Sequence, residues 1–209
     1  MIVVVETNFV LELVIEQAEA TACQRILDLA RGGNIRLAIP SFSIAEAIQT
    51  IEKRRGERRD FLHTNLQPHI RELSRAVPLA QYADLYRQLN TELFKAEAAE
   101  ANRMSLFLRE SMKTMHLIPL TSNELLTGWS LTTGEEQQET KTLRASDALV
   151  YASVIAALRR REQIPAERAC FVTRDRDFDK ETLRTLLQTL DCRLMFSFAD
   201  AVGLIEAHS

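Results

Sequence analysis

Short apolar runs alternate along the chain with longer stretches in which apolar residues recur every three or four positions. Runs of four or five residues that are rich in β-branched and aromatic side chains predict buried strands. They lie at residues 2–5, 35–39, 116–120, 169–173 and 192–196. The stretches between them predict helices. Because strands and helices alternate, the pattern favours an α/β fold built of βα units on one central parallel sheet of about five strands.

Gly, Pro and Ser residues predict where several of these elements begin and end. Gly32-Gly33 is expected to stop the helix that follows Thr21. Pro40 closes the second strand, and Ser41 or Ser43 suits the N-cap of the next helix. The polar residues 132–142 predict a mobile loop.

Between the second and third strands the pattern becomes almost entirely helical. Residues 52–60 are nearly all charged, and Gly56 predicts a turn or break among them. Residues 61–115 read as helix, with Pro78 separating two helices. Since this stretch offers only a thin core of its own, we interpret residues 52–115 as a helical insertion within a single domain that spans residues 1–209.

Composition and charge leave the class of protein open but exclude several. Of the 209 residues 46% are hydrophobic and 26% charged, which is ordinary globular usage and excludes a disordered or collagen-like chain. The formal net charge of -3 excludes a globally basic nucleic-acid coat, although a local basic patch remains compatible with it.

The cysteines and the first residues indicate a cytoplasmic setting. Cys23, Cys170 and Cys192 are odd in number and far apart, which disfavours a disulfide framework or a zinc site. The opening residues reach a charge after five positions, so they do not resemble a signal peptide. No run is long enough to span a bilayer.

Acidic residues follow the predicted strands at the edge where a parallel sheet binds ligands. Glu6 follows the first strand, and Glu46 lies in the helix after the second. Asp147 lies in the first turn of a helix, and Asp175 follows the fourth strand, with Asp177 two residues later. Singly, each has an ordinary explanation as a helix cap, a turn residue or a solvated helix residue.

Taken together these acids predict a metal site. Two carboxylates about 4 Å apart repel by roughly 4 kcal/mol at an effective dielectric constant of 20, so a cluster needs protons or a cation. Carboxylate oxygens suit Mg²⁺ or Mn²⁺. A cation held in this way can activate water and stabilise a phosphorane-like transition state, which is the chemistry of phosphodiester hydrolysis.

Four segments resemble the PIN-domain nucleases, a family that includes the VapC-type toxins of toxin–antitoxin pairs. They occur in the family's order and are Val5-Glu6-Thr7-Asn8, Ser43-Ile44-Ala45-Glu46, Ser146-Asp147-Ala148-Leu149 and Val172-Thr173-Arg174-Asp175-Arg176-Asp177-Phe178. The resemblance implies a three-layer α/β/α sandwich. It also implies an endoribonuclease that depends on Mg²⁺ or Mn²⁺.

The same resemblance implies roles for individual residues. The four catalytic, metal-binding acids would be Glu6, Glu46, Asp147 and Asp175. Asp177 would be a further metal ligand, and Asn8 and Thr173 would orient carboxylates or waters. The chain departs from the family in two respects: Glu6 stands where Asp is usual, and the helical stretch makes it longer than the compact toxins.

Basic residues beside these acids indicate how substrate would be held. Arg174 and Arg176 lie at the end of the fourth strand and are the best candidates for contacting RNA. Sequence-specific recognition usually targets unpaired nucleotides, so single-stranded or loop RNA is the expected substrate. Trp129 is more typical of a core or interface residue than of a base-stacking platform.

Two readings of function remain open. The first is the RNase, with an antitoxin protein as a partner. The second is a binding module on the same scaffold, impaired in catalysis by Glu6, that works through protein or RNA contacts. A homodimer is expected in either case, because Tyr82, Tyr86 and Phe94 exceed what a small sheet can cover.

Overall fold

The computed structural model describes residues 1–133, 143–161 and 168–207. These residues form two compact units, one of residues 1–47 with 107–209 and the other of residues 48–106. The first is a sheet covered by helices and the second is a pair of long helices, and each is described by itself.

The sheet of the first unit has five parallel strands in the order β3-β2-β1-β4-β5. Their bounds are Ile2–Val5 for β1, Arg36–Pro40 for β2, Met115–Ile118 for β3, Ala169–Val172 for β4 and Cys192–Met195 for β5. The prediction of five strands on a parallel sheet is therefore confirmed, with shifts of one or two residues at the ends. Burial of β1 and β4 on both faces explains why their sequences are continuously apolar.

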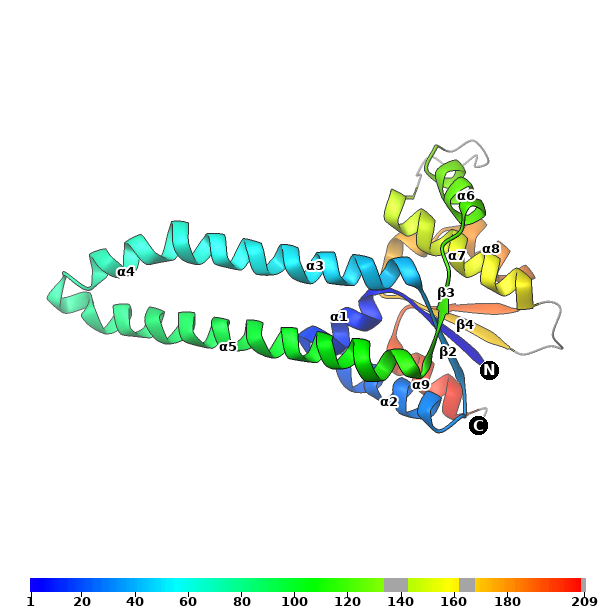
Figure 1. The fold of residues 1–209 in the computed structure, drawn as a ribbon, viewed down its shortest axis with the longest axis horizontal. Coiled ribbons are helices and arrows are strands. Elements are labelled where there is room, and N and C mark those ends of the chain that lie inside the picture. Colours follow the sequence, from blue (N-terminus) through cyan, green and yellow to red (C-terminus); the bar gives the residue numbers. More distant parts are fainter. Residues whose placement is uncertain (134–142, 162–167, 208–209) are drawn as a thin grey trace. The chain divides into compact units, whose positions relative to one another are not determined.

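Helices cover both faces of this sheet, which gives the predicted α/β/α sandwich (Figure 1). On one face lie α1 (Thr7–Ile15), α2 (Ala20–Arg31) and α9 (Phe198–Glu206). On the other lie α6 (Ser122–Thr133), α7 (Ala145–Arg161) and α8 (Glu181–Thr189). Two 3-10 turns, Ser111–Lys113 and Arg176–Phe178, complete the described elements of this unit. None of the described helices is long and apolar enough to cross a membrane.

The predicted helix boundaries hold at some positions and fail at others. Gly32 caps α2, and Gly33 adopts a φ of 76°, which glycine accepts without strain. Gly56, in contrast, does not break the chain, because it lies inside α3 (Ser41–Asp60). The predicted loop at residues 132–142 is wrong at its start, since α6 continues to Thr133, and residues 134–142 lie outside the described parts.

The second unit consists of antiparallel helices that run side by side (Figure 1). This unit contains most of α3 and most of α5 (Ala80–Glu110). Between them lie a π-helical turn (Phe61–Leu66), α4 (Gln67–Leu73) and a 3-10 turn (Val77–Leu79). Pro78 thus separates two helices, as predicted. Along α5 one series of less exposed positions recurs alternately every three and four residues, which is the spacing of a coiled coil. It comprises Ala83, Tyr86, Asn90, Leu93, Glu97, Glu100 and Met104.

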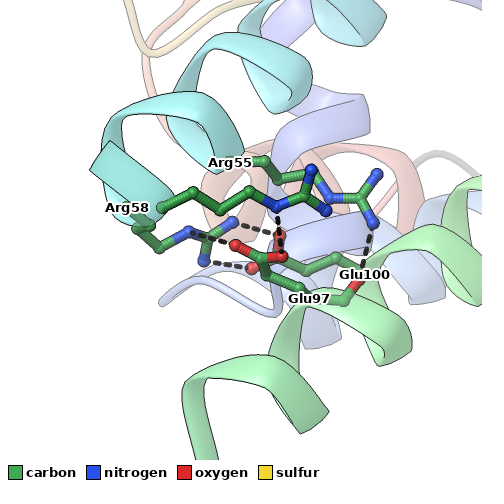
Figure 2. A network of polar contacts seen from close by, with 5 residues as sticks. Arg55, Arg58, Glu97 and Glu100 are labelled. Carbon is green, nitrogen blue, oxygen red and sulfur yellow. Dashed lines mark hydrogen bonds and ion pairs between the residues drawn. The ribbon is translucent and has the colours of Figure 1, made fainter. Parts of the chain in front are cut away.

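Charged residues of α3 contact charged residues of α5 in a network of polar contacts (Figure 2). The guanidinium of Arg58 donates two hydrogen bonds to the Glu100 carboxylate, at 2.8 and 2.5 Å, and Arg55 donates to the backbone carbonyl of Glu97 at 3.2 Å. Both Glu97 and Glu100 are only 4% exposed. The charge run at residues 52–60 is therefore a partly buried ion-pair layer as well as a solvated surface.

Candidate metal site

Three aspartates form the centre of the candidate site at the carboxyl ends of the strands. One carboxylate oxygen from each of Asp147, Asp175 and Asp177 lies within 4.8 Å of the other two. Asp147 comes from the first turn of α7, whereas Asp175 and Asp177 come from the segment after β4. Residues almost thirty positions apart in the sequence therefore converge on one point.

Asp147 is the most buried member of the cluster. It is 9% exposed, and its Oδ2 is buried without a hydrogen-bond partner among the described residues. Its other oxygen accepts a hydrogen bond of 3.2 Å from the Ser146 hydroxyl. Burial and the charge of Asp175 raise the pKa of Asp147 to about 6. A buried oxygen without a partner is costly unless something else satisfies it.

The other two aspartates are held by a short turn. Asp175 caps the 3-10 turn by accepting a hydrogen bond of 2.8 Å from the backbone N–H of Asp177. The N–H of Asp175 in turn donates to the hydroxyl of Thr173 at 2.9 Å. Asp177 is exposed, and its carboxylate lies 3.8 Å from Nε of Arg144. The backbone thus fixes where Asp175 points, and Arg144 partly balances Asp177.

Glu6 lies beside these aspartates but is engaged as a helix cap. Its Oε2 accepts a hydrogen bond of 2.9 Å from the backbone N–H of Asn8, and its Oε1 accepts one of 3.1 Å from the Thr173 hydroxyl. The side chain is 4% exposed. Burial is the largest influence on its pKa, which rises to about 7, and the charge of Glu46 adds to the rise.

The carboxylate of Glu46 interacts electrostatically with both Glu6 and Asp147. Its charge raises the pKa of both of those carboxyls. It is half-buried, and its Oε2 accepts a hydrogen bond from the hydroxyl of Thr7. The structure therefore gathers all five predicted acids into one neighbourhood, but only the three aspartates form the tight group.

The two residues predicted to orient carboxylates or waters, Asn8 and Thr173, both donate hydrogen bonds to Glu6. Thr173 bonds to Glu6 and to the Asp175 backbone, whereas Asn8 acts on Glu6 through its N–H and also lowers the pKa through its side chain. Thr7 and Ser146 were missed by the sequence analysis. Their position directly beside Glu6 and Asp147 was the available signal.

The two arginines predicted to bind substrate differ in their surroundings. Arg174 forms an ion pair with Glu12, a fully buried residue of α1, so its charge is already engaged. Arg176 lies over the ring of Phe196, with its guanidinium carbon 4.3 Å from the ring centroid. It also lies 3.7 Å from a carboxylate oxygen of Asp179. Trp129, on α6, is 67% exposed, so it is not a core residue.

Comparison with known proteins identifies the family. The sequence model of the PIN domain matches residues 3–178, which is most of the chain, so this protein belongs to the PIN-domain family. PIN domains are generally nucleases, and the acidic cluster lies within the matched region. No curated protein matches the chain.

One solved structure is similar to this chain over most of its length. It is the crystal structure of VapBC2 from Rickettsia felis bound to a DNA fragment from their promoter. The match covers 93% of this chain and 97% of that one, with 16% sequence identity and a TM-score of 0.45.

Proposed function

We propose that this protein is a metal-dependent endoribonuclease that hydrolyses RNA phosphodiester bonds. The observation that carries the proposal is the group of three aspartates in which one buried oxygen, Oδ2 of Asp147, has no hydrogen-bond partner among the described residues. Family membership supports the nuclease class, whereas the metal and the RNA substrate are inferences from the site.

The donor set fits a hard divalent cation. All the converging atoms are carboxylate oxygens, which Mg²⁺ and Mn²⁺ prefer over nitrogen or sulfur. Asp147, Asp175 and Asp177 would hold the ion, with the charges of Glu6 and Glu46 nearby. When bound, the ion supplies an activated water and stabilises negative charge on the phosphate.

The chain's own residues prepare this site. Thr173 links the Asp175 segment to Glu6, since its hydroxyl donates to one and accepts from the other. Ser146 holds one Asp147 oxygen and leaves Oδ2 available. The carboxylates are thereby oriented before any ion arrives, which reduces the cost of ordering them on binding.

Replacement of Asp175 by Asn tests the proposal. We expect cleavage of a single-stranded RNA in Mn²⁺ to fall by at least about 100-fold, because loss of a metal ligand should cost no less than loss of an outer-shell partner. Mn²⁺ should raise the melting temperature of the wild type and not that of the variant. Asp28→Asn, at an exposed position of α2, is the matched control and should behave as wild type. Undiminished cleavage by Asp175→Asn would overturn the assignment.

A second candidate function is a binding module of impaired activity, and the state of Glu6 favours it. Both Glu6 oxygens already accept hydrogen bonds, so this residue is engaged where the family usually has Asp. Isothermal titration distinguishes the two: heat on addition of Mn²⁺ supports the nuclease, and no heat at millimolar Mn²⁺ supports the binding module.

We also propose the predicted partners, location and domain organisation. We infer a role as the toxin of a toxin–antitoxin pair, a homodimer and a cytoplasmic location, together with a single domain in which the helical stretch is an insertion. Family membership supports the first of these. Gel filtration of the purified chain, alone and after co-expression with a neighbouring gene product, tests the dimer and the antitoxin.

A further inference from the structure

A groove of about 530 Å³ runs along β5, the strand at one edge of the sheet. Its lining comes from Arg184 and Gln188 of α8, from Ala169 at the start of β4 and from residues 192–194 of β5. Three of its lining residues are arginines, Arg168, Arg184 and Arg193, against one acid, Asp191. The groove therefore carries an excess of positive charge although the whole chain is negative.

The three arginines differ in whether a described residue forms an ion pair with them. Arg184 forms an ion pair with Asp179. Arg168 and Arg193 make no ion pair within residues 1–133, 143–161 and 168–207, and both side chains are exposed. Uncompensated arginines in a groove attract a polyanion and release its counterions when it binds.

One end of the groove is linked to the segment that carries two of the aspartates, whereas its other end lies at the amino ends of the strands, where Arg168 and Asp191 line it. Phe196 lines it and is only half-buried. The guanidinium of Arg176, the residue between Asp175 and Asp177, lies over this ring, and that of Arg184 lies 6.0 Å from the ring centroid. Phe196 and Arg176 thus connect the groove to the segment that carries Asp175 and Asp177.

We propose that this groove binds the backbone of a single-stranded RNA whose scissile phosphate lies at the aspartate cluster, a proposal that rests on the proposed function. A basic groove with an aromatic ring at one end is the combination by which proteins bind single strands without reading their sequence. An edge strand can instead accept an extended acidic peptide. The connection to the segment that carries the acids and the ring of Phe196 favour RNA.

The test measures RNA binding separately from RNA cleavage. Fluorescence anisotropy with a labelled 12-nucleotide oligouridylate is recorded in EDTA, with Asp175→Asn in every protein to prevent cutting. Adding Arg168→Ala and Arg193→Ala should weaken binding by about tenfold or more. It should also reduce the slope of log K against log salt by about 1.4, since two phosphate contacts are lost.

A charge-matched control keeps the comparison specific. Arg31→Ala with Lys113→Ala removes two cations from exposed surface pairs of the same unit and should leave RNA affinity unchanged. Unchanged melting temperatures establish that the variants fold.

The outcomes separate this proposal from the one on which it rests. If the oligouridylate binds equally well to the double variant and the wild type, the groove proposal is wrong even where cleavage is normal. It is also wrong if the arginines are needed to bind polyglutamate and not RNA. If binding depends on the two arginines but no divalent ion supports cleavage, the nuclease proposal fails and the groove remains an RNA site.

Discussion

The two compact units both bury carboxylates but neutralise them by different means. In the helical unit Glu97 and Glu100 are 4% exposed, and their carboxylates accept hydrogen bonds from Arg59 and Arg58 respectively. In the sheet unit Glu6 and Asp147 are about as buried, yet the charges that act on their pKa values are those of other acids. Burial alone therefore does not identify a functional acid.

The pKa values record this difference. The hydrogen bonds and charge of Arg58 lower the pKa of Glu100, whereas burial and neighbouring acids raise those of Glu6 and Asp147. A carboxylate that the fold has already paired stabilises structure. A carboxylate that lies near other carboxylates and has no cationic partner is available to a metal ion.

Among the changes that test this comparison, Glu100→Ala is expected to lower the free energy of unfolding most. Removing one partner of a buried ion pair leaves Arg58 without its main acceptor and should lower the free energy of unfolding by about 3 kcal/mol or more. Urea denaturation measures it. The double variant Arg58→Leu with Glu100→Leu is the control and should lie close to wild type, because an apolar pair suits a coiled-coil position. A Glu100→Ala protein as stable as wild type would show that the pairing is not structural.

A change of pH should alter the stability of the sheet unit by a similar amount for each of its two acids with a raised pKa. The pKa values of Glu6 and Asp147 are raised from ordinary values of 4.5 and 3.8 to about 7 and about 6, so the folded protein keeps protons that the unfolded chain has lost. This contribution to stability is fully present below about pH 4 and is lost as the pH rises through 6 and 7. It amounts to roughly 3 kcal/mol for each group.

Urea denaturation in EDTA at pH 4.5 and pH 8 measures this loss. Glu6→Gln and Asp147→Asn should each lose less stability between the two pH values than wild type does, because each removes one titrating group. If both variants show the wild-type dependence, other groups control it and the acids are not held at raised pKa values.

The smallest effect should come from the exposed ion pair of Arg87 and Asp84 on α5. Both side chains are more than half exposed, at 54% and 68%, so Asp84→Ala should change the free energy of unfolding by less than about 1 kcal/mol. The same urea experiment provides the measurement. A loss as large as that of Glu100→Ala would mean that pairing matters in this unit whether or not it is buried.

The sequence predicts the sheet well and the helical unit less well, for physical reasons. The runs at residues 2–5 and 169–173 are apolar because both faces are covered, which is a local and readable signal. The run at residues 52–60 looks like a solvated surface, because the acids that face it lie about forty residues away on α5. Gly56 costs only about 1 kcal/mol inside a helix, which the helix can tolerate.

The sequence predicts only part of the candidate site. The order of the acids predicted their neighbourhood, since parallel strands end at one edge of the sheet. That the tight group contains Asp177 and leaves Glu6 as a helix cap depends on hydrogen bonds from Asn8 and Thr173, which spacing does not reveal. The pairing of Arg174 with Glu12 is equally long-range, so the spacing of the sequence does not reveal it.

The register between β1 and β4 determines how this chain can tolerate changes in length. Val5 pairs with Val172, so Glu6 and Thr173 are the next residues on adjacent strands, and their hydrogen bond follows from that alignment. Because side chains alternate between faces, inserting one residue within either strand would turn Glu6 or Thr173 to the opposite side. Natural relatives should therefore vary in length between Ile48 and Leu106 far more readily than within these two four-residue strands.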